Sequence, residues 1–198
     1  YIPKNLGARA LDVSHIRRDL VGKVKAAAAT RRRKRCARPG VKAVLRQVVH
    51  RGETFVTPSV ICIGCSTGGP RALQHILPAL PAHLPAGIVV VQHMPQGFTR
   101  PFADRLNALC RVHVKEAEAD DKVDPGTVLI APAGWHLTLY RRAHSSYAVR
   151  LTKTPADVLH IPSVDVLMLS AAEVVRERTM GVILTGMGND GEAGMKAI

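Results

Sequence analysis

Short apolar runs alternate with helical patterns from about residue 59 to the end of the chain. The pattern predicts strands over residues 61–64, 87–92, 112–115, 128–131 and 180–184, and helices over residues 70–80, 98–109 and 163–176. Two further runs, 135–140 and 148–151, are typical of a β-hairpin. Such alternation favours an α/β fold, a doubly wound and mostly parallel sheet with helices on both faces in three Rossmann-like layers, plus the hairpin.

Three of the predicted strands end in loops that carry a reactive side chain. Ser66 follows the first strand in a Gly-rich turn, His93 directly follows the second, and Asp190 lies in the Gly-rich loop after the last. Glycines let the backbone turn tightly where a Cβ would clash. Because ligand chemistry in parallel sheets sits at the carboxyl ends of the strands, these three side chains can converge at one edge.

A serine, a histidine and an aspartate together suit nucleophilic catalysis. Serine needs a base to take its proton, and histidine, with a pKa of about 6.5, can accept that proton and return it. An aspartate fixes the imidazole tautomer and stabilises the imidazolium. The chain order Ser66, His93, Asp190 differs from the Ser, Asp, His order of the α/β-hydrolases, so a standard α/β-hydrolase is excluded.

Each of the three residues also has a structural interpretation. Ser66 would suit a turn or the N-cap of the helix that follows it. His93 would suit a partly buried histidine bonded to the backbone, and the chain has eight other histidines, including His160. Asp190, in G-N-D-G, would suit a tight turn. Their joint position at strand ends favours a catalytic site.

The Gly-rich turn after the first strand admits two other interpretations. A dinucleotide site would need the G-x-G-x-x-G spacing, which is absent from Gly64, Gly68 and Gly69. It would also need an acidic residue at the end of the next strand to bind the ribose, and none is present there. As a redox site, Cys62 and Cys65 form a C-x-x-C pattern, but Cys62 falls inside the apolar strand, where a thiol behaves as a small hydrophobe. Both interpretations are therefore disfavoured.

The net charge of +13 is concentrated at the N-terminal end. Residues 1–58 hold 15 of the 28 Lys and Arg but only 3 of the 15 Asp and Glu. The block of five basic residues at 31–35 could bind an acidic docking surface or nucleic acid, or could be a solvated tether. We favour the tether, since no aromatic residues are interleaved to stack on bases.

No apolar run approaches the length of about 18 residues that spans a membrane, so we expect a cytoplasmic protein with reduced cysteines.

Five motifs occur in a fixed order between about residues 58 and 198. They read G-C-S-T-G-G-P, V-V-V-Q-H-M-P-Q-G-F-T-R-P-F-A-D-R-L, I-A-P-A-G-W-H, H-I-P-S-V-D-V-L and I-L-T-G-M-G-N-D-G. Together they resemble the catalytic domain of the chemotaxis-type protein-glutamate methylesterases, which are response regulators. The resemblance implies a catalytic triad of Ser66, His93 and Asp190. It further implies an oxyanion hole made by the backbone N–H groups of Thr67 and Met187, with no metal or organic cofactor.

The resemblance also implies an activity and partners. The expected reaction is hydrolysis of γ-glutamyl methyl esters on the cytoplasmic helices of chemoreceptors through an acyl-enzyme on Ser66, with deamidation of receptor glutamines in some members. The protein's own receiver domain is the second expected partner, without nucleic acid or membrane insertion. A non-catalytic receptor-binding or scaffold module that retains the fold is the alternative.

The resemblance divides the chain into three parts. Residues 1–29 resemble the last strand and helix of a receiver domain, with Lys4 at the position of the lysine that contacts the phosphoryl group. Residues 30–58 are expected to be a basic linker, and residues 59–198 a catalytic domain that is truncated at its C-terminus.

Three residues depart from the family pattern. Cys65 stands where alanine or another small residue is usual, and Ala133 stands where glycine is common. Glu192 replaces a small residue and adds a carboxylate near Asp190, where it could perturb the local field.

Overall fold

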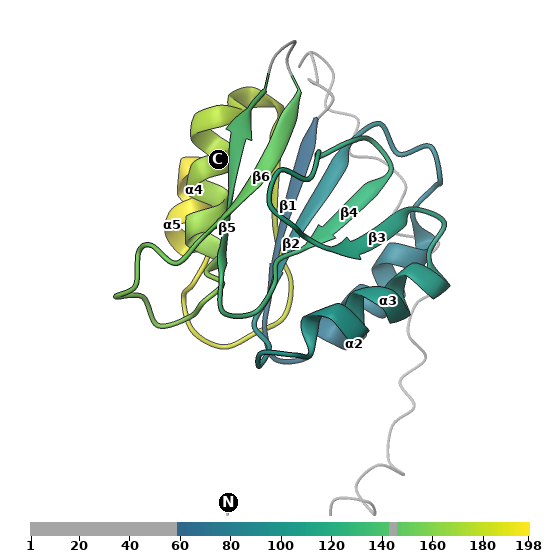
Figure 1. Cartoon of the computed structure of the whole chain (residues 1–198), viewed down its shortest axis with the longest axis horizontal. Coiled ribbons are helices and arrows are strands. Elements are labelled where there is room, and N and C mark those ends of the chain that lie inside the picture. The colour runs from purple at the N-terminus through teal and green to yellow at the C-terminus, as the bar shows by residue number, and fades with distance from the viewer. Residues whose placement is uncertain (1–58, 143–145) are drawn as a thin grey trace, which may run out of the picture. The chain divides into compact units, whose positions relative to one another are not determined.

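The computed structural model describes residues 59–142 and 146–198 (Figure 1). The two N-terminal segments expected from the sequence, the receiver remnant at 1–29 and the basic linker at 30–58, lie outside the described residues and stay predictions.

Five parallel strands form the central sheet (Figure 1). In chain order they are β1 (Val60–Cys65), β2 (Gly87–Gln92), β3 (His113–Glu116), β4 (Thr127–Ile130) and β7 (Thr179–Ile183). Their spatial order is β3-β4-β2-β1-β7, and every neighbouring pair runs parallel. Since β1 has β2 on one side and β7 on the other, the loops that leave the carboxyl ends of these three strands lie beside one another.

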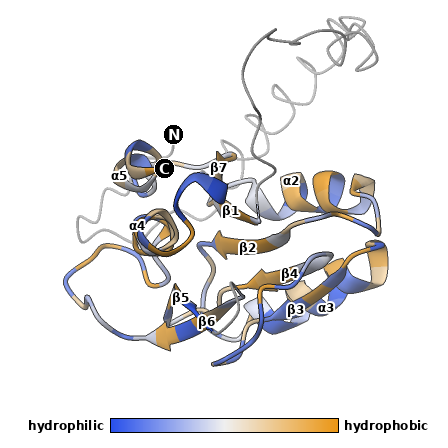
Figure 2. Ribbon diagram, turned by 90° about the horizontal axis from the view of Figure 1, so that it is seen from above, coloured by the Kyte–Doolittle hydropathy of each residue, from blue (hydrophilic) through white to orange (hydrophobic). Residues whose placement is uncertain are grey.

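Helices cover both faces of the sheet. They are α2 (Gly69–Ile76) and α3 (Thr99–Leu109) on one face, and α4 (Val164–Val174), with α5 (Glu192–Ala197) beside it, on the other. Alternate strand residues point to opposite faces, so Ile63 and Val90 pack under α2 and α3 while Cys62 and Val89 pack on the α4 side. Figure 2 shows the hydrophobic strands β1, β2 and β4 as a layer between these helices.

A small antiparallel sheet extends the core on the α4 side. It consists of β5 (His136–Arg141) and β6 (Tyr147–Thr152), whose residues Leu137 and Val149 are buried. Ser170 of α4 accepts a hydrogen bond from the Leu139 N–H at 3.0 Å and so ties the hairpin to the helix. No helix in the described ranges is long and apolar enough to cross a membrane.

The predicted α/β fold with helices on both faces and a hairpin is confirmed, and the predicted strands lie within one or two residues of the observed ones. Two predicted helices are shorter than expected. The helix predicted over 70–80 changes to a 3-10 turn, η2 (Leu77–Ala79), where Pro78 lacks an N–H group. The helix predicted over 163–176 gives way to a second 3-10 turn, η4 (Arg176–Arg178).

Candidate active site

Ser66 lies in the turn between β1 and α2, and its backbone is fixed on both sides. Its N–H donates to the Thr185 carbonyl at 2.9 Å, and its carbonyl accepts from the Gly69 N–H at 2.9 Å. The N-cap of α2 is Gly68, with φ of +81°, so the interpretation of Ser66 as N-cap is wrong. The Ser66 hydroxyl makes no hydrogen bond with any residue that the structure describes.

The loop after β7 approaches the serine turn closely. A Cβ on Gly186 would come within 2.9 Å of the Ser66 Cβ, so this position needs a glycine. The Thr185 hydroxyl donates to the Thr67 carbonyl at 2.9 Å and joins the two loops. Within the described ranges, the N–H groups of Thr67 and Met187 have no hydrogen-bond partner. Two unpaired donors thus lie on loops that meet beside Ser66.

His93 begins the loop after β2 and is tied to the serine turn through the backbone. Its N–H donates to the Cys65 carbonyl at 3.0 Å. The amide nitrogen of Gln92, a residue that is 1 % exposed, donates both to the Ser66 carbonyl at 2.9 Å and to the His93 carbonyl at 3.0 Å. One buried side chain therefore holds the turns that carry Ser66 and His93 together.

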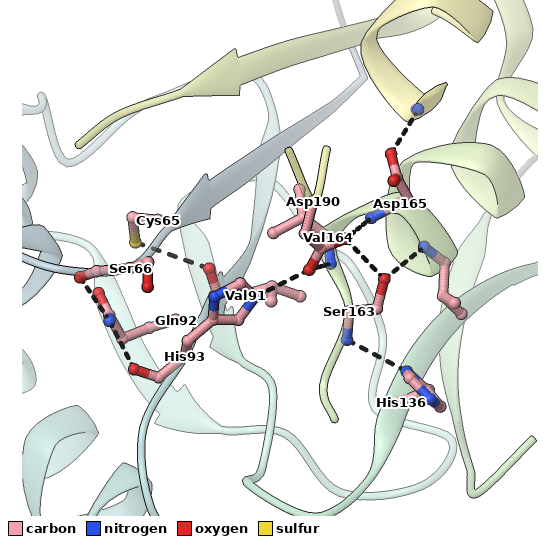
Figure 3. Close-up of polar contacts among 12 residues, drawn as sticks. Cys65, Ser66, Val91, Gln92, His93, His136, Ser163, Val164, Asp165 and Asp190 are labelled. Atoms are coloured by element: carbon pink, nitrogen blue, oxygen red, sulfur yellow. Dashed lines mark hydrogen bonds and ion pairs between the residues drawn. The ribbon is translucent and has the colours of Figure 1, made fainter. Parts of the chain in front are cut away.

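The ring of His93 pairs with the carboxylate of Asp190 (Figure 3). The distance between His93 Nε2 and Asp190 Oδ2 is 2.8 Å. The structural interpretation, in which the ring would bond to the backbone, is therefore wrong. An ionised carboxylate only accepts, which places the proton of a neutral His93 ring on Nε2. The other ring nitrogen, Nδ1, is buried and has no partner among the described residues. In the neutral ring, Nδ1 is therefore the nitrogen with a free lone pair, and no described residue donates a hydrogen bond to it.

Asp190 is held by the first turn of α4. Its Oδ1 accepts from the Ser163 hydroxyl at 2.7 Å and the Asp165 N–H at 2.9 Å, and its Oδ2 accepts from the Val164 N–H at 2.8 Å. Burial raises the pKa of Asp190, but the hydrogen bonds from His93, from the two N–H groups and from Ser163 outweigh it and hold the pKa well below its usual range. The position of Asp190 is thus set by a helix N-terminus and not by a tight turn alone.

A second histidine supports Ser163 from behind. The Nε2 of His136, which is fully buried, lies 2.9 Å from the Pro155 carbonyl, which only accepts, so Nε2 carries the proton. His136 Nδ1 therefore accepts from the Ser163 N–H, at 3.1 Å. Ser163 is also the N-cap of α4, since its side chain accepts from the Val166 N–H at 3.3 Å. His136 and Ser163 thus fix the start of the helix that holds Asp190.

The ring of His160 stacks on the ring of His93, with centroids 4.1 Å apart and an interplanar angle of 26°. Sequence reasoning assigned no role to His160, His136 or Ser163. The available signal is their presence in the motifs I-A-P-A-G-W-H and H-I-P-S-V-D-V-L.

A cleft of about 110 Å³ opens between the loops that follow β1, β2 and β7. Ser66, His93 and Asp190 all line it, together with Met187. The structure thus joins His93 to Asp190 directly and places Ser66 on the wall of the same cleft. An attacking hydroxyl, an imidazole base and a fixed carboxylate in one cleft suit acyl transfer.

Two of the residues that depart from the family pattern lie near the site, and Cys65 lines the cleft itself. Burial raises the pKa of Cys62 and of Cys65 to about 12, so both stay protonated thiols, which argues against the redox interpretation. The Glu192 carboxylate lies 2.6 Å from Lys196 Nζ, so a lysine one helical turn away offsets its charge. The described residues include no cluster of His, Cys, Asp or Glu that could hold a metal ion.

Comparison with known proteins supports the sequence resemblance. The family model for CheB methylesterase matches residues 61–198. A protein-glutamate methylesterase/protein-glutamine glutaminase 2 of Nitratidesulfovibrio vulgaris is 43% identical over all of this chain and 59% of its own length. A protein-glutamate methylesterase/protein-glutamine glutaminase 3 of Geobacter sulfurreducens is 47% identical over 88% of the chain and 47% of its own length. The chain thus spans about half the length of these relatives.

A solved structure has the same fold. The crystal structure of the Thermotoga maritima CheB methylesterase catalytic domain superposes with a TM-score of 0.67 at 45% identity, over 72% of this chain and 75% of the other. The family match covers most of the described residues and includes the loops that carry Ser66, His93 and Asp190. The chain therefore belongs to the CheB methylesterase family.

Proposed function

We propose that this chain is a serine-type protein-glutamate methylesterase whose catalytic residues are Ser66, His93 and Asp190. The observation that carries the proposal is the pairing of His93 Nε2 with the Asp190 carboxylate, which leaves Nδ1 without a hydrogen-bond partner among the described residues, on a histidine that lines the same cleft as Ser66. The names of the relatives, protein-glutamate methylesterase/protein-glutamine glutaminase, support the same substrate chemistry.

The first step is attack on the ester. As Ser66 Oγ bonds to the carbonyl carbon of a glutamyl methyl ester, His93 Nδ1 takes the hydroxyl proton. The imidazolium that forms is stabilised by Asp190, whose low pKa keeps it ionised. The N–H groups of Thr67 and Met187, on the two loops joined by Thr185, donate to the tetrahedral oxyanion.

The second step releases the alcohol. The bond between the carbonyl carbon and the methoxy oxygen breaks, and His93 returns the proton from Nδ1 to that oxygen, so methanol leaves and a glutamyl ester remains on Ser66. Water then attacks this acyl-enzyme while His93 again takes a proton. As the ester bond to Ser66 breaks, His93 returns this proton to Ser66 Oγ, which regenerates the hydroxyl and releases the glutamate side chain as an acid that ionises to the carboxylate. With a glutamine substrate the same steps release ammonia.

The partners and setting that we propose are those that the family resemblance implies. The substrates are methylated cytoplasmic helices of chemoreceptors, and the protein acts in the cytoplasm in chemotaxis signalling. Residues 1–29 are the end of a receiver domain that regulates the site, and residues 30–58 are a tether to the catalytic domain at 59–198.

Methanol release from a methylated receptor fragment tests the proposal. We expect Ser66→Ala and His93→Gln each to lower kcat by roughly 10⁴-fold or more, since the triad residues act as a unit. Unchanged far-UV circular dichroism controls for folding. Parent protein that releases no more methanol than Ser66→Ala would contradict the proposal and leave the non-catalytic receptor-binding module.

A further inference from the structure

We infer that His160 is a positioning residue that fixes the ring of His93 by stacking, an inference that rests on the proposed function. The two rings lie 4.1 Å apart between centroids at an angle of 26°. His160 belongs to the segment between β6 and α4, far in sequence from the end of β2, and the proposed mechanism assigns it no proton or bond to transfer.

The segment that carries His160 is anchored directly after the ring contact. The carbonyl of the next residue, Ile161, accepts from the Gly134 N–H at 3.1 Å. Ser163, three residues further on, is bonded to His136 and to Asp190. The stack is therefore part of the same framework that holds the carboxylate, and not the contact of a free surface side chain.

His93 needs such a contact because its hydrogen bond fixes only one ring atom. Rotation about the Cβ–Cγ bond of histidine is broad, so the bond from Nε2 to Asp190 leaves the plane of the ring poorly defined. The direction in which Nδ1 points depends on that plane, and no described residue bonds Nδ1. The His160 ring, stacked on one face of the His93 ring, restricts the plane of His93 and so fixes the direction of Nδ1.

The charge that forms on His93 also favours an aromatic neighbour. During attack His93 becomes an imidazolium, and a cation within about 6 Å of an aromatic face is attracted to it. An aliphatic side chain of similar size would fill the space but would offer neither a flat face nor this attraction. The comparison of phenylalanine with leucine at position 160 therefore isolates the role of the ring.

The experiment compares His160→Phe, His160→Leu and the parent as full chains. The control is His83→Ala, which removes an exposed histidine before β2. For methanol release from a methylated receptor fragment, we expect His160→Leu to lower kcat roughly ten- to a hundredfold with KM within about twofold, as for a small misplacement of a catalytic group. His160→Phe should stay within about threefold of the parent, and His83→Ala should match it.

A measurement independent of activity accompanies the kinetics. In protein with ¹⁵N-labelled histidine, we expect His93 of the parent and of His160→Phe to show an unprotonated Nδ1 and a protonated Nε2. In His160→Leu this protonation pattern should stay the same, because Asp190 still accepts from Nε2, but the His93 nitrogen signals should broaden as the ring plane samples a wider range of angles. Circular dichroism checks that each variant is folded.

Three results would overturn the inference: a kcat for His160→Leu within about twofold of the parent, equal losses in the Phe and Leu variants, or His93 nitrogen line widths that are the same in all folded variants. A parent as inactive as Ser66→Ala would instead overturn the proposed function, and the nitrogen line widths would still decide whether His160 holds the His93 ring.

Discussion

The side chains of Asp190 and Ser66 line the same cleft but are held in opposite ways. The Asp190 carboxylate accepts four hydrogen bonds, three of them from the first turn of α4 or its cap. The Ser66 hydroxyl makes none with the described residues, although its backbone N–H and carbonyl are both bonded. Under the proposed mechanism the carboxylate must keep its charge and place, whereas the nucleophile must leave its oxygen lone pairs for the substrate. The framework therefore stabilises the acid through its side chain and the nucleophile through its backbone.

The largest effect should come from removing the charge that this framework holds. Asp190→Asn replaces an acceptor-only group by an amide whose NH₂ can face His93 and reverse its tautomer. We expect kcat for methanol release to fall by roughly 10⁴-fold, as for the equivalent change in a serine protease triad. Glu192→Gln is the matched control, because Glu192 pairs with Lys196 on the surface, and it should match the parent. A comparable loss in both variants would show that the effect is not specific to Asp190.

A smaller effect is expected from weakening the support of the carboxylate. Ser163→Ala removes the hydroxyl that bonds Asp190 and caps α4. We expect the free energy of unfolding in urea to fall by about 1–2 kcal/mol, as for loss of an N-cap, and kcat to fall roughly tenfold. Ser163→Thr keeps a hydroxyl and should recover most of both losses. Full activity in folded Ser163→Ala would mean that the backbone N–H groups of α4 alone are sufficient.

Acidification tests the same carboxylate through stability. The pKa of Asp190 in the folded protein lies below that of an unfolded aspartate, which is about 3.9. Its stabilising contribution is therefore complete above the unfolded pKa and is lost as pH falls through the folded pKa. Between pH 5 and pH 2, the free energy of unfolding of the parent should fall more steeply than that of Asp190→Asn. Parallel pH profiles for the two proteins would contradict the low pKa.

The smallest effect concerns the loop contact on the serine side. Thr185→Val removes the hydroxyl that donates to the Thr67 carbonyl but keeps the shape of the side chain. Loss of one hydrogen bond of about 0.5–1.5 kcal/mol would reduce kcat about two- to tenfold, by loosening the two proposed oxyanion donors. Thr185→Ser should retain the parent rate. An increase in KM alone would place the effect in substrate binding instead.

The sequence predicted the sheet and the edge on which the cleft lies, because both depend on local patterns. Apolar runs of strand length, each followed by a Gly-rich or polar loop, bring the residues after β1, β2 and β7 to one edge of a parallel sheet. Serine at position 163 was likewise recognisable as the start of a helix, although its bond to Asp190 was not. That bond depends on how the loop after β7 packs on α4, and the hydrophobic periodicity of the sequence gives no information on this packing.

The contacts around His93 were the least predictable part. The segment from 153 to 162 has no regular element in the structure and no apolar period in the sequence, so the position of His160 could not be derived from either. The N-cap interpretation of Ser66 failed for a related reason. The left-handed conformation of Gly68 begins α2 two residues later, and a backbone angle of that kind is not determined by the residue types alone.

The double hydrogen bond of Gln92 has a mechanical consequence. Because one buried NH₂ group bonds the carbonyls of both Ser66 and His93, a shift of either turn pulls on the other. When the edge of the sheet fluctuates, Ser66 and His93 would then move in the same direction. The separation between hydroxyl and imidazole is thereby buffered against motions of the sheet that would otherwise change it.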